Sequence, residues 1–272
     1  MQAASRESLE AVQATFDAQV NGLDADGIGT LADDLAAVAK LLLGEVVLRK
    51  YLAGRAEDSA GKHAMADKLF GGKIGAPALE VLKSTVAQRW SRSRDIPTTL
   101  IRYARLAILI DAERAGQLET VEDELFRLGR TLDANHRLAS LLGDHTKPVD
   151  GRIALLNNVI GNKTTSYTAR LVQQTVRGSH GEHFDEVVAD LAELAAQRRG
   201  ESVAHVVAAA PLTDAQIQRL ESALSRVYGR NMSVQLDIDP EVLGGLRVTV
   251  GDEVVDGTIA SRLVSAAAQL PR

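Results

Sequence analysis

The 272-residue chain contains no cysteine, which excludes disulfide bridges, thiolate nucleophiles and cysteine-based metal sites. Aromatic residues make up only 3% of the sequence, with a single tryptophan, whereas hydrophobic residues as a class make up 45%. The apolar content therefore lies mainly in aliphatic side chains such as alanine and leucine, which is typical of packed helices. The length allows two or three domains.

The sequence also has little excess of charge and no long hydrophobic run. Its 31 Lys and Arg residues against 36 Asp and Glu residues give a net charge of −5 at pH 7, which argues against a nucleic-acid-binding protein. No apolar run reaches the roughly 18 residues that span a bilayer, and Met1 to Arg6 contains no signal-peptide core. We expect no nucleic-acid partner, no direct membrane insertion, and membrane association only through a partner.

Residues suited to catalysis or metal binding are few and scattered. Of six histidines only His180 and His183 are clustered, and the sequence supplies no third ligand near them. The Gly71-Gly72-Lys73 run lacks the Ser or Thr that follows the lysine of a phosphate-binding loop, so it is interpreted as a helix C-cap. The basic run from 89 to 94 is either a docking patch or a solvated loop anchored by Trp90. We predict no catalytic residue, no metal and no cofactor.

The sequence resembles itself after an offset of 90 residues. Without gaps, twelve of the 57 positions from 30 to 86 are identical to the position 90 residues later. Roughly four identities are expected by chance at this composition. The pairs include Gly71 with Gly161 and Thr85-Val86 with Thr175-Val176. A period near 90 is too long for a solenoid repeat and favours two copies of a whole helical domain. We therefore predict two tandem six-helix bundles.

Hydrophobic periodicity places the elements of the second copy and of the chain's last part. The helices expected in the second copy cover 101–113, 120–132, 135–142, 149–160, 166–177 and 182–197, and the last helix of the first copy, from Ile96 onward, is expected to run directly into the second copy. Beyond these, the sequence predicts strands at 203–209, 233–238, 246–250 and 253–255, a helix at 215–228, and a last helix that opens at 256–258. The predicted fold is mainly α with a small α+β C-terminal module. The predicted domains are an additional, duplicated bundle (1–100), a second bundle (101–200) and the C-terminal module (201–272).

Turn residues at fixed offsets mark the end of the sequence. Gly244-Gly245 precedes an alternating strand, Gly251-Asp252 supplies a tight turn, and Val254 to Thr258 reads Val-Val-Asp-Gly-Thr, with Arg262 shortly after. This order resembles the C-terminal signature of the δ subunit of bacterial F-type ATP synthases, a family related to the oligomycin-sensitivity subunit (OSCP) of mitochondria. The resemblance covers 201–272 well and is weaker from about residue 100 to that point.

The resemblance implies a non-catalytic stator subunit. Subunits of this family connect the N-terminal helices of α subunits, at the tip of the catalytic hexamer, to the peripheral b stalk, and so resist rotor torque. The implied location is the cytoplasmic face of the cell membrane, as a peripheral part of the ATP synthase. The duplicated bundle resembles the extended actinobacterial form, in which δ is fused behind a b-type membrane helix, so we expect this chain to be part of a longer protein.

The resemblance also implies contact residues. In the second bundle, an α-subunit helix is expected in a groove between the first and fifth helices, lined by Tyr103, Ala104, Ala107, Ile108, Leu171, Val172, Thr175 and Val176. The matching candidates of the first bundle, where Gln13 replaces the tyrosine, are Ala14, Val81, Leu82, Thr85 and Val86. The structural or stalk-contact candidates of the C-terminal signature are Gly244, Gly245, Gly251, Asp252, Asp256, Gly257 and Arg262. The alternative function is a helical scaffold or adaptor in another multiprotein complex.

Overall fold

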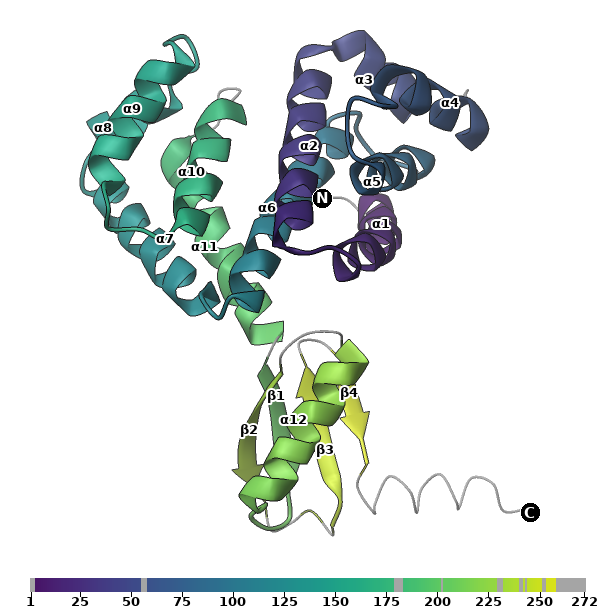
Figure 1. The fold of residues 1–272 in the computed structure, drawn as a ribbon, viewed down its shortest axis with the longest axis vertical. Coiled ribbons are helices and arrows are strands. Elements are labelled where there is room, and N and C mark those ends of the chain that lie inside the picture. The colour runs from purple at the N-terminus through teal and green to yellow at the C-terminus, as the bar shows by residue number, and fades with distance from the viewer. Residues whose placement is uncertain are drawn as a thin grey trace. The chain divides into compact units, whose positions relative to one another are not determined.

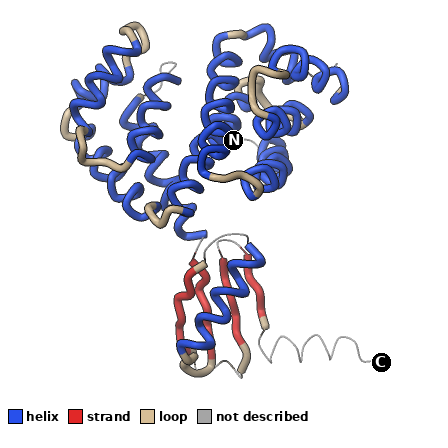
Figure 2. Tube along the Cα trace, viewed as in Figure 1, coloured by secondary structure: helices blue, strands red, loops and turns tan. Residues whose placement is uncertain are grey.

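The computed structural model describes residues 3–54, 58–178, 183–201, 203–228, 232–239, 242, 244–250 and 253–257. The chain divides into two compact units, Met1–Leu194 and Ala195–Arg272. All strands of the described residues lie in the second unit, and helices build the first (Figure 2). The structure thus confirms a mainly helical chain with a small α+β module at its C-terminal end.

Eleven helices precede the first strand in the described part of the chain (Figure 1). Those of the N-terminal half are α1 (Ala3–Asn21), α2 (Ala25–Gly44), α3 (Val46–Ala53), α4 (Ser59–Phe70), α5 (Ala76–Ala87) and α6 (Asp95–Arg114). They are followed by α7 (Leu118–Asp133), α8 (His136–Gly143), α9 (Val149–Ile160), α10 (Ser166–Gly178) and α11 (Phe184–Glu201). The helices predicted for the second copy match α6 to α11; α6 begins six residues before the predicted start at 101, and the other ends differ by four residues or fewer.

Helix boundaries recur at the offset seen in the sequence. Helices α8, α9 and α10 each begin 90 residues after α3, α4 and α5 respectively. Helix α6 lies about 90 residues after α1 and about 90 residues before α11. It therefore corresponds to the first helix of the second copy and also to the last helix of the first. Two tandem bundles of six helices are not confirmed in that form, because eleven helices, not twelve, fill this part of the described chain.

Loop details repeat between the two copies as well. The Gly71 amide donates to the Asp67 carbonyl at 2.8 Å, and the Gly161 amide donates to the Asn157 carbonyl at 2.8 Å. Both glycines directly follow a helix, which confirms that Gly71-Gly72-Lys73 is a helix C-cap. Trp90 is 6% exposed, and its indole Nε1 donates to the Thr85 carbonyl at 2.7 Å. The basic run is therefore a loop anchored by this tryptophan.

A carboxylate from one helix caps the start of another at equivalent positions in both copies. Asp34 on α2 accepts the Gly75 amide at 2.7 Å, just before α5. Glu124 on α7 accepts the Thr165 amide at 2.9 and 3.0 Å and the Thr165 hydroxyl at 3.0 Å, just before α10. A negative charge at a helix N-terminus is favourable, because it satisfies free amides and faces the positive end of the helix dipole.

The second unit is a four-stranded sheet with one helix. Its elements are β1 (Val203–Ala208), α12 (Asp214–Tyr228), β2 (Ser233–Ile238), β3 (Leu246–Val250) and β4 (Glu253–Asp256). The strand order is β2-β1-β3-β4, with β1 parallel to β2 and the other pairs antiparallel. Parallel neighbours need a crossover connection, which α12 supplies. Thr213 and Gln216 start α12 as a capping box, since each side chain bonds the other residue's amide.

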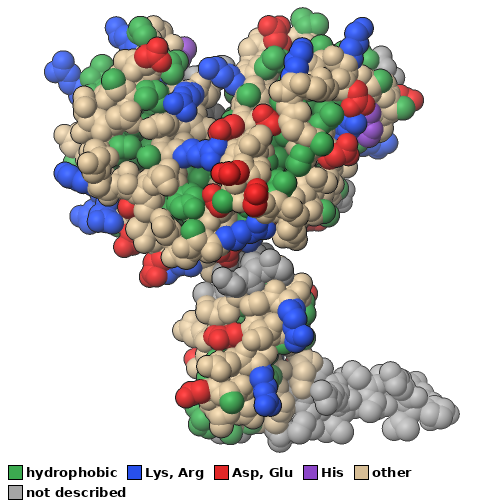
Figure 3. Space-filling model, in the orientation of Figure 1, with side chains coloured by type: hydrophobic (Ala, Val, Ile, Leu, Met, Phe, Trp, Pro, Cys, Tyr) green, Lys and Arg blue, Asp and Glu red, His purple; other side chains and the backbone are tan. Residues whose placement is uncertain are grey.

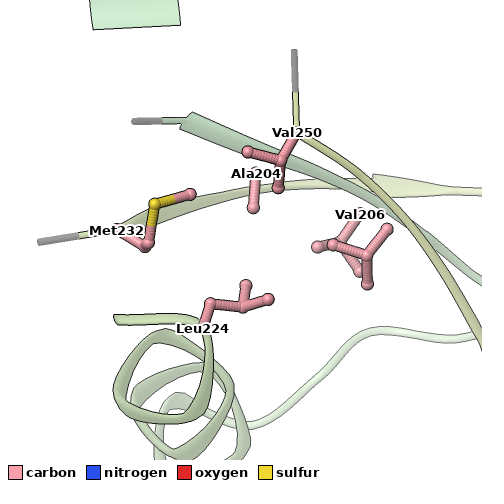
Figure 4. Packing of buried hydrophobic residues seen from close by; sticks show 6 residues of the cluster. Ala204, Val206, Leu224, Met232 and Val250 are labelled. Atoms are coloured by element: carbon pink, nitrogen blue, oxygen red, sulfur yellow. The ribbon is translucent and has the colours of Figure 1, made fainter. Parts of the chain in front are cut away.

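The core of this module lies between the sheet and α12. Ala204 and Val206 of β1 and Leu224 of α12 point toward one another, with Met232 and Val250 at the edge of the cluster (Figure 4). Alternate residues of β1 and β3 face this core, which is the period-2 pattern expected for a half-buried strand. The four predicted strands and the helix predicted at 215–228 are all present, whereas the last predicted helix lies outside the described residues.

Two glycines offer a matched test of local backbone strain. Gly161 has φ +52° and ψ −138°, a conformation that side chains with a Cβ rarely adopt. Gly161→Ala is therefore expected to lower the free energy of unfolding by about 1–2 kcal/mol. Gly129→Ala, in the interior of α7 where an added Cβ meets no atom within 4 Å, should raise it by about 0.5–1 kcal/mol. Urea unfolding measures the free energy of unfolding of both variants. Equal changes in the two variants would contradict the conformation assigned to Gly161.

Candidate protein-binding groove

Helix α6 is the central helix of the helical unit. Twelve of its 20 residues are buried, and it packs most extensively against α2. The Tyr103 ring stacks on Phe16 of α1 with the ring centroids 4.7 Å apart, and its hydroxyl donates to the Leu9 carbonyl at 2.8 Å. Burial raises the pKa of Tyr103 above its ordinary value, so the phenol stays neutral and remains a donor. Tyr103 thus fastens the first helix of the second copy to the first copy.

The C-terminal end of α6 also forms hydrogen bonds to the first copy. The Arg114 guanidinium donates to the Leu23 carbonyl at 2.8 Å and to the Val20 carbonyl at 3.1 Å, at the C-terminal end of α1. A cation at this end of a helix satisfies free carbonyls and opposes the negative end of the dipole. Helix α6 therefore contacts α1 both through Tyr103 and through Arg114.

The eight residues predicted for the groove of the second bundle occupy two neighbouring helices, α6 and α10. Seven of them are at most 2% exposed: Tyr103, Ala104, Ala107, Ile108, Leu171, Val172 and Val176. Thr175 is 6% exposed, and its hydroxyl donates to the Leu171 carbonyl at 3.0 Å. The described structure brings these residues together as core, and their contact with a partner stays a prediction.

An open cavity lies beside this buried set. It has a volume of about 340 Å³ and is lined by α2, α6 and α10, so that both copies contribute walls. Helix α6 contributes Ile101 and Arg105, and α10 contributes Thr175, the one predicted groove residue that reaches the cavity. The accessible part of the α6–α10 groove is therefore shifted by part of a helical turn from the predicted residues of α6.

One wall of the cavity carries an ion pair between the copies. Arg170 of α10 donates to the Asp33 carboxylate of α2 at 2.6 Å and to the Gly29 carbonyl at 2.6 Å. Close by, burial raises the pKa of the Asp111 carboxyl, while the cations of Arg170 and Arg114 act in the opposite direction. Arg170 is thus held in place by groups 137 or more residues away in the chain.

The first copy has its candidate residues on α1 and α5. Val81, Leu82, Thr85 and Val86 are fully buried, whereas Ala14 is exposed on α1. The two helices are bridged by a hydrogen bond of 3.1 Å between the hydroxyls of Thr15 and Ser84. Ala14 is therefore the member of this set that a partner reaches without any rearrangement.

The C-terminal signature is described only in part. Gly244 and Gly245 have φ of +129° and +85°, which explains why glycines precede β3. The Gly257 amide donates to the Leu246 carbonyl at 2.9 Å, and the Asp256 carboxylate lies 3.6 Å from the Arg247 guanidinium. These contacts close the β3–β4 hairpin. Gly251, Asp252 and Arg262 lie outside the described residues.

The basic residues that line the cavity were not among those predicted from the sequence. These residues are Lys40 on α2, Arg105 on α6, and Arg170 and Arg177 on α10. The i, i+7 spacing of Arg170 and Arg177 could have indicated a common helix face. Nothing in the sequence shows that this face lies against α2.

Metal binding and membrane crossing each require a recognisable arrangement of side chains. No group of three or more His, Cys, Asp or Glu side chains there is placed to hold a metal ion. None of the described helices combines the length and the apolar character that a membrane crossing requires. The described residues form a helical unit with an open groove and a small α+β module.

The chain belongs to the ATP synthase delta (OSCP) subunit family, which matches residues 99–270. It is 52% identical over 271 residues to "ATP synthase subunit b-delta" of Mycobacterium sp. (strain KMS) and of Mycobacterium sp. (strain JLS). These alignments cover 100% of this chain and 61% of each relative, so the chain spans less than two thirds of their length. The family was recognised correctly from the C-terminal signature, and it is a family of non-catalytic subunits.

One solved structure also contains a chain that matches this one at low identity. A chain in the cryo-EM structure of the Toxoplasma gondii mitochondrial ATP synthase hexamer is 19% identical to this one. The match covers 62% of this chain and 96% of that chain, with a TM-score of 0.32.

Proposed function

We propose that this chain is the delta part of the stator of a proton-translocating F-type ATP synthase. In this function it links N-terminal helices of α subunits of the catalytic hexamer to the peripheral b stalk, so that the stalk resists rotary torque. The observation that carries the proposal is the family match over residues 99–270 together with the b-delta names of its relatives. The proposed location is the cytoplasmic face of the cell membrane, where the chain is held by its partners.

The proposal assigns a part to each segment. Residues 1–100 and 101–200 act as two helical bundles. They are joined by α6, which crosses the boundary between them, and this is consistent with helix boundaries that repeat after 90 residues. Residues 201–272 act as the module that meets the stalk. The second bundle receives an α-subunit helix between α6 and α10. The first receives another between α1 and α5, where Ala14 is exposed.

Helix burial in a groove is the physical basis of this adaptor function. An amphipathic helix lays its apolar face into a groove between two helices, and small residues allow a close approach. Binding should therefore depend on accessible residues of the groove, such as Ile101, more than on the fully buried Tyr103 or Ala107.

The test is a calorimetric titration of the full chain with a synthetic peptide of the α-subunit N-terminus. We expect a stoichiometry of two, with Ala14→Arg reducing it to one, because an added arginine at this exposed position blocks the α1–α5 site. Ile101→Arg should abolish the other site. Fluorescence of Trp90, which contacts α5 through the Thr85 carbonyl, reports the first site alone.

Controls separate binding from folding in this test. Each variant should keep the unfolding midpoint of the parent chain, since Ala14 is exposed and Ile101 is only partly buried. A stoichiometry of one that Ala14→Arg leaves unchanged would refute the site in the first copy. A folded chain that binds no peptide at all would refute the proposed function.

A further inference from the structure

One polar contact joins the two copies beside the open cavity. Arg170 of α10 donates to the Gly29 carbonyl and to the Asp33 carboxylate of α2, each at 2.6 Å. The cavity lies between the same two helices. On the drawn face, Lys and Arg side chains lie next to Asp and Glu side chains where the two halves of the helical unit meet, and the surface is hollowed between the halves (Figure 3). Helices α2 and α10 are thus bonded at one end of the cavity and stand apart along the rest of it.

Gly29 leaves the room that this contact needs. It lies buried in the interior of α2, where glycine is a poorer helix former than alanine. A Cβ added at Gly29 would lie only 2.9 Å from Nη1 of Arg170. The repeat does not supply this pair, because the position 90 residues after Gly29 is Glu119 and the position 90 residues before Arg170 is Glu80. The contact therefore belongs to the junction between the copies.

The contact between α2 and α10 is polar, unlike the interior side of α2. The buried residues of α2 are all apolar, and α6 is the helix that packs most extensively against it. One turn beyond Arg170, Gln174 donates to the Ala32 carbonyl at only 3.4 Å, and its shielded Oε1 has no hydrogen-bond partner in the described part of the chain. The side chains of Arg170 and Asp33 are 35% and 68% exposed. A half-exposed ion pair is weak and screened by salt, so it can separate while the apolar packing persists.

Arg170 has a second carboxylate close to its charge. Burial raises the pKa of the Asp111 carboxyl on α6, and the Arg170 guanidinium acts in the opposite direction, so the two groups face each other. Arg170 therefore lies between Asp33 of α2 and Asp111 of α6. If the pair with Asp33 opens, the guanidinium stays beside an opposite charge, and the opening does not leave an uncompensated cation between the helices.

We infer that the contact of Arg170 with Gly29 and Asp33 is a latch between the two copies. The closed latch fixes the distance between α2 and α10, and with it the width of the cavity. Release lets α10 move away from α2 by a small shift along α6, while both copies stay folded. The inference does not rest on the proposed stator function, because the latch lies within the chain and needs no partner.

The test measures the distance between the two cavity walls in the full chain. Because the sequence contains no cysteine, Lys40→Cys and Arg177→Cys supply a single pair of thiols for nitroxide labels, at exposed positions of α2 and α10. Double electron–electron resonance should give one narrow distance distribution for this labelled chain. Asp33→Ala, which removes the carboxylate of the latch, should broaden the distribution and increase its mean by about 2 Å, the scale of helix shifts at interfaces.

Gly29→Ala releases the latch by a second route. The added Cβ conflicts with the flexible end of the Arg170 side chain, so the guanidinium is displaced while α2 stays helical. We expect the same broadening as for Asp33→Ala. The matched controls are Gly129→Ala, in the interior of α7, and Asp123→Ala, at the position 90 residues after Asp33. Both controls should leave the distribution unchanged, and circular dichroism verifies that every variant is folded.

A double variant separates the latch from an effect on α2 alone. In an Arg170→Ala chain the distribution should already be broad, and adding Gly29→Ala should change it no further. Three results would overturn the inference: no change with Gly29→Ala and Asp33→Ala, equal broadening in the control variants, and further broadening by Gly29→Ala in the Arg170→Ala chain. The stator function is tested separately by the titration with the α-subunit peptide, so either conclusion can fail without the other.

Discussion

Tyr103→Ala is expected to destabilise the helical unit by about 3–5 kcal/mol, because it removes a fully buried aromatic ring from the contact between α6 and α1. The change leaves a cavity beside Phe16 and leaves the Leu9 carbonyl without its donor. Urea unfolding followed by helical circular dichroism measures the loss. Because α6 belongs to both copies, amide hydrogen exchange should rise in α1 and also in α10, which packs on α6.

Tyr103→Phe separates the ring from the hydroxyl. The phenylalanine keeps the stacked ring and loses only the hydrogen bond to Leu9, so we expect a loss of about 1 kcal/mol. Similar losses for the alanine and phenylalanine variants would show that the ring packing contributes little. Faster exchange confined to the second copy would contradict the fastening of α6 to α1.

Glu124→Ala is expected to cost about 2–3 kcal/mol of unfolding free energy. The Glu124 carboxylate is 7% exposed and accepts the amide and the hydroxyl of Thr165, at the N-terminus of α10. Its removal leaves the Thr165 amide without its acceptor and takes a negative charge from the start of the helix, while the Thr165 hydroxyl keeps a second acceptor in Thr168 Oγ1 at 3.2 Å. Urea unfolding followed by helical circular dichroism measures this loss.

The repeated sequence offers a matched comparison for this prediction. Asp34→Ala removes the equivalent carboxylate of the first copy, which accepts only the Gly75 amide and is less buried. We expect a loss of about 1 kcal/mol, the usual cost of removing a helix cap. If the two variants lower the free energy of unfolding equally, the additional Thr165 hydroxyl bond and the deeper burial of Glu124 do not contribute to stability.

The shared helix has a mechanical consequence under the proposed function. Two bundles joined by a flexible linker would turn independently under load, whereas a common buried helix makes one copy follow the other. Helix α6 is fastened through Tyr103 and Arg114 to α1, and the Asp33–Arg170 pair adds a contact between α2 and α10. A stator that resists torque benefits from this construction, because its α-subunit sites then keep a fixed separation.

Local sequence patterns were sufficient for the secondary structure. Apolar spacing and caps gave the helices of the second copy to within a few residues, and 149–160 coincides with α9 at both ends. The four strands and α12 followed from period-2 alternation and from glycine turns such as Gly244-Gly245. These features depend on neighbours within a few residues, which the sequence contains explicitly.

The groove was predicted less well than the elements that build it. Tyr103 and Ala107 were assigned to a partner contact, which stays a prediction; in the structure both are fully buried, and the Tyr103 ring stacks on Phe16 of the first copy. Helical periodicity identifies an apolar face, but an internal neighbour and an external partner produce the same face. The separation between core residues such as Tyr103 and cavity residues such as Ile101 depends on where α2 packs.

The sequence by itself thus determined the helical class, the repeat of 90 residues, the absence of cysteine chemistry and the family signature. Only the tertiary structure decided that Tyr103 and Arg114 bind α6 to α1 and that Arg170 meets Asp33 across 137 residues. It also decided that Lys40, Arg105 and Arg177 surround one cavity. The physical reason is the distance along the chain over which each interaction acts. Caps, turns and periodicity depend on neighbours within a few residues, whereas the contacts of α6 with α1 and the charged cavity arise from the packing of segments far apart in the chain.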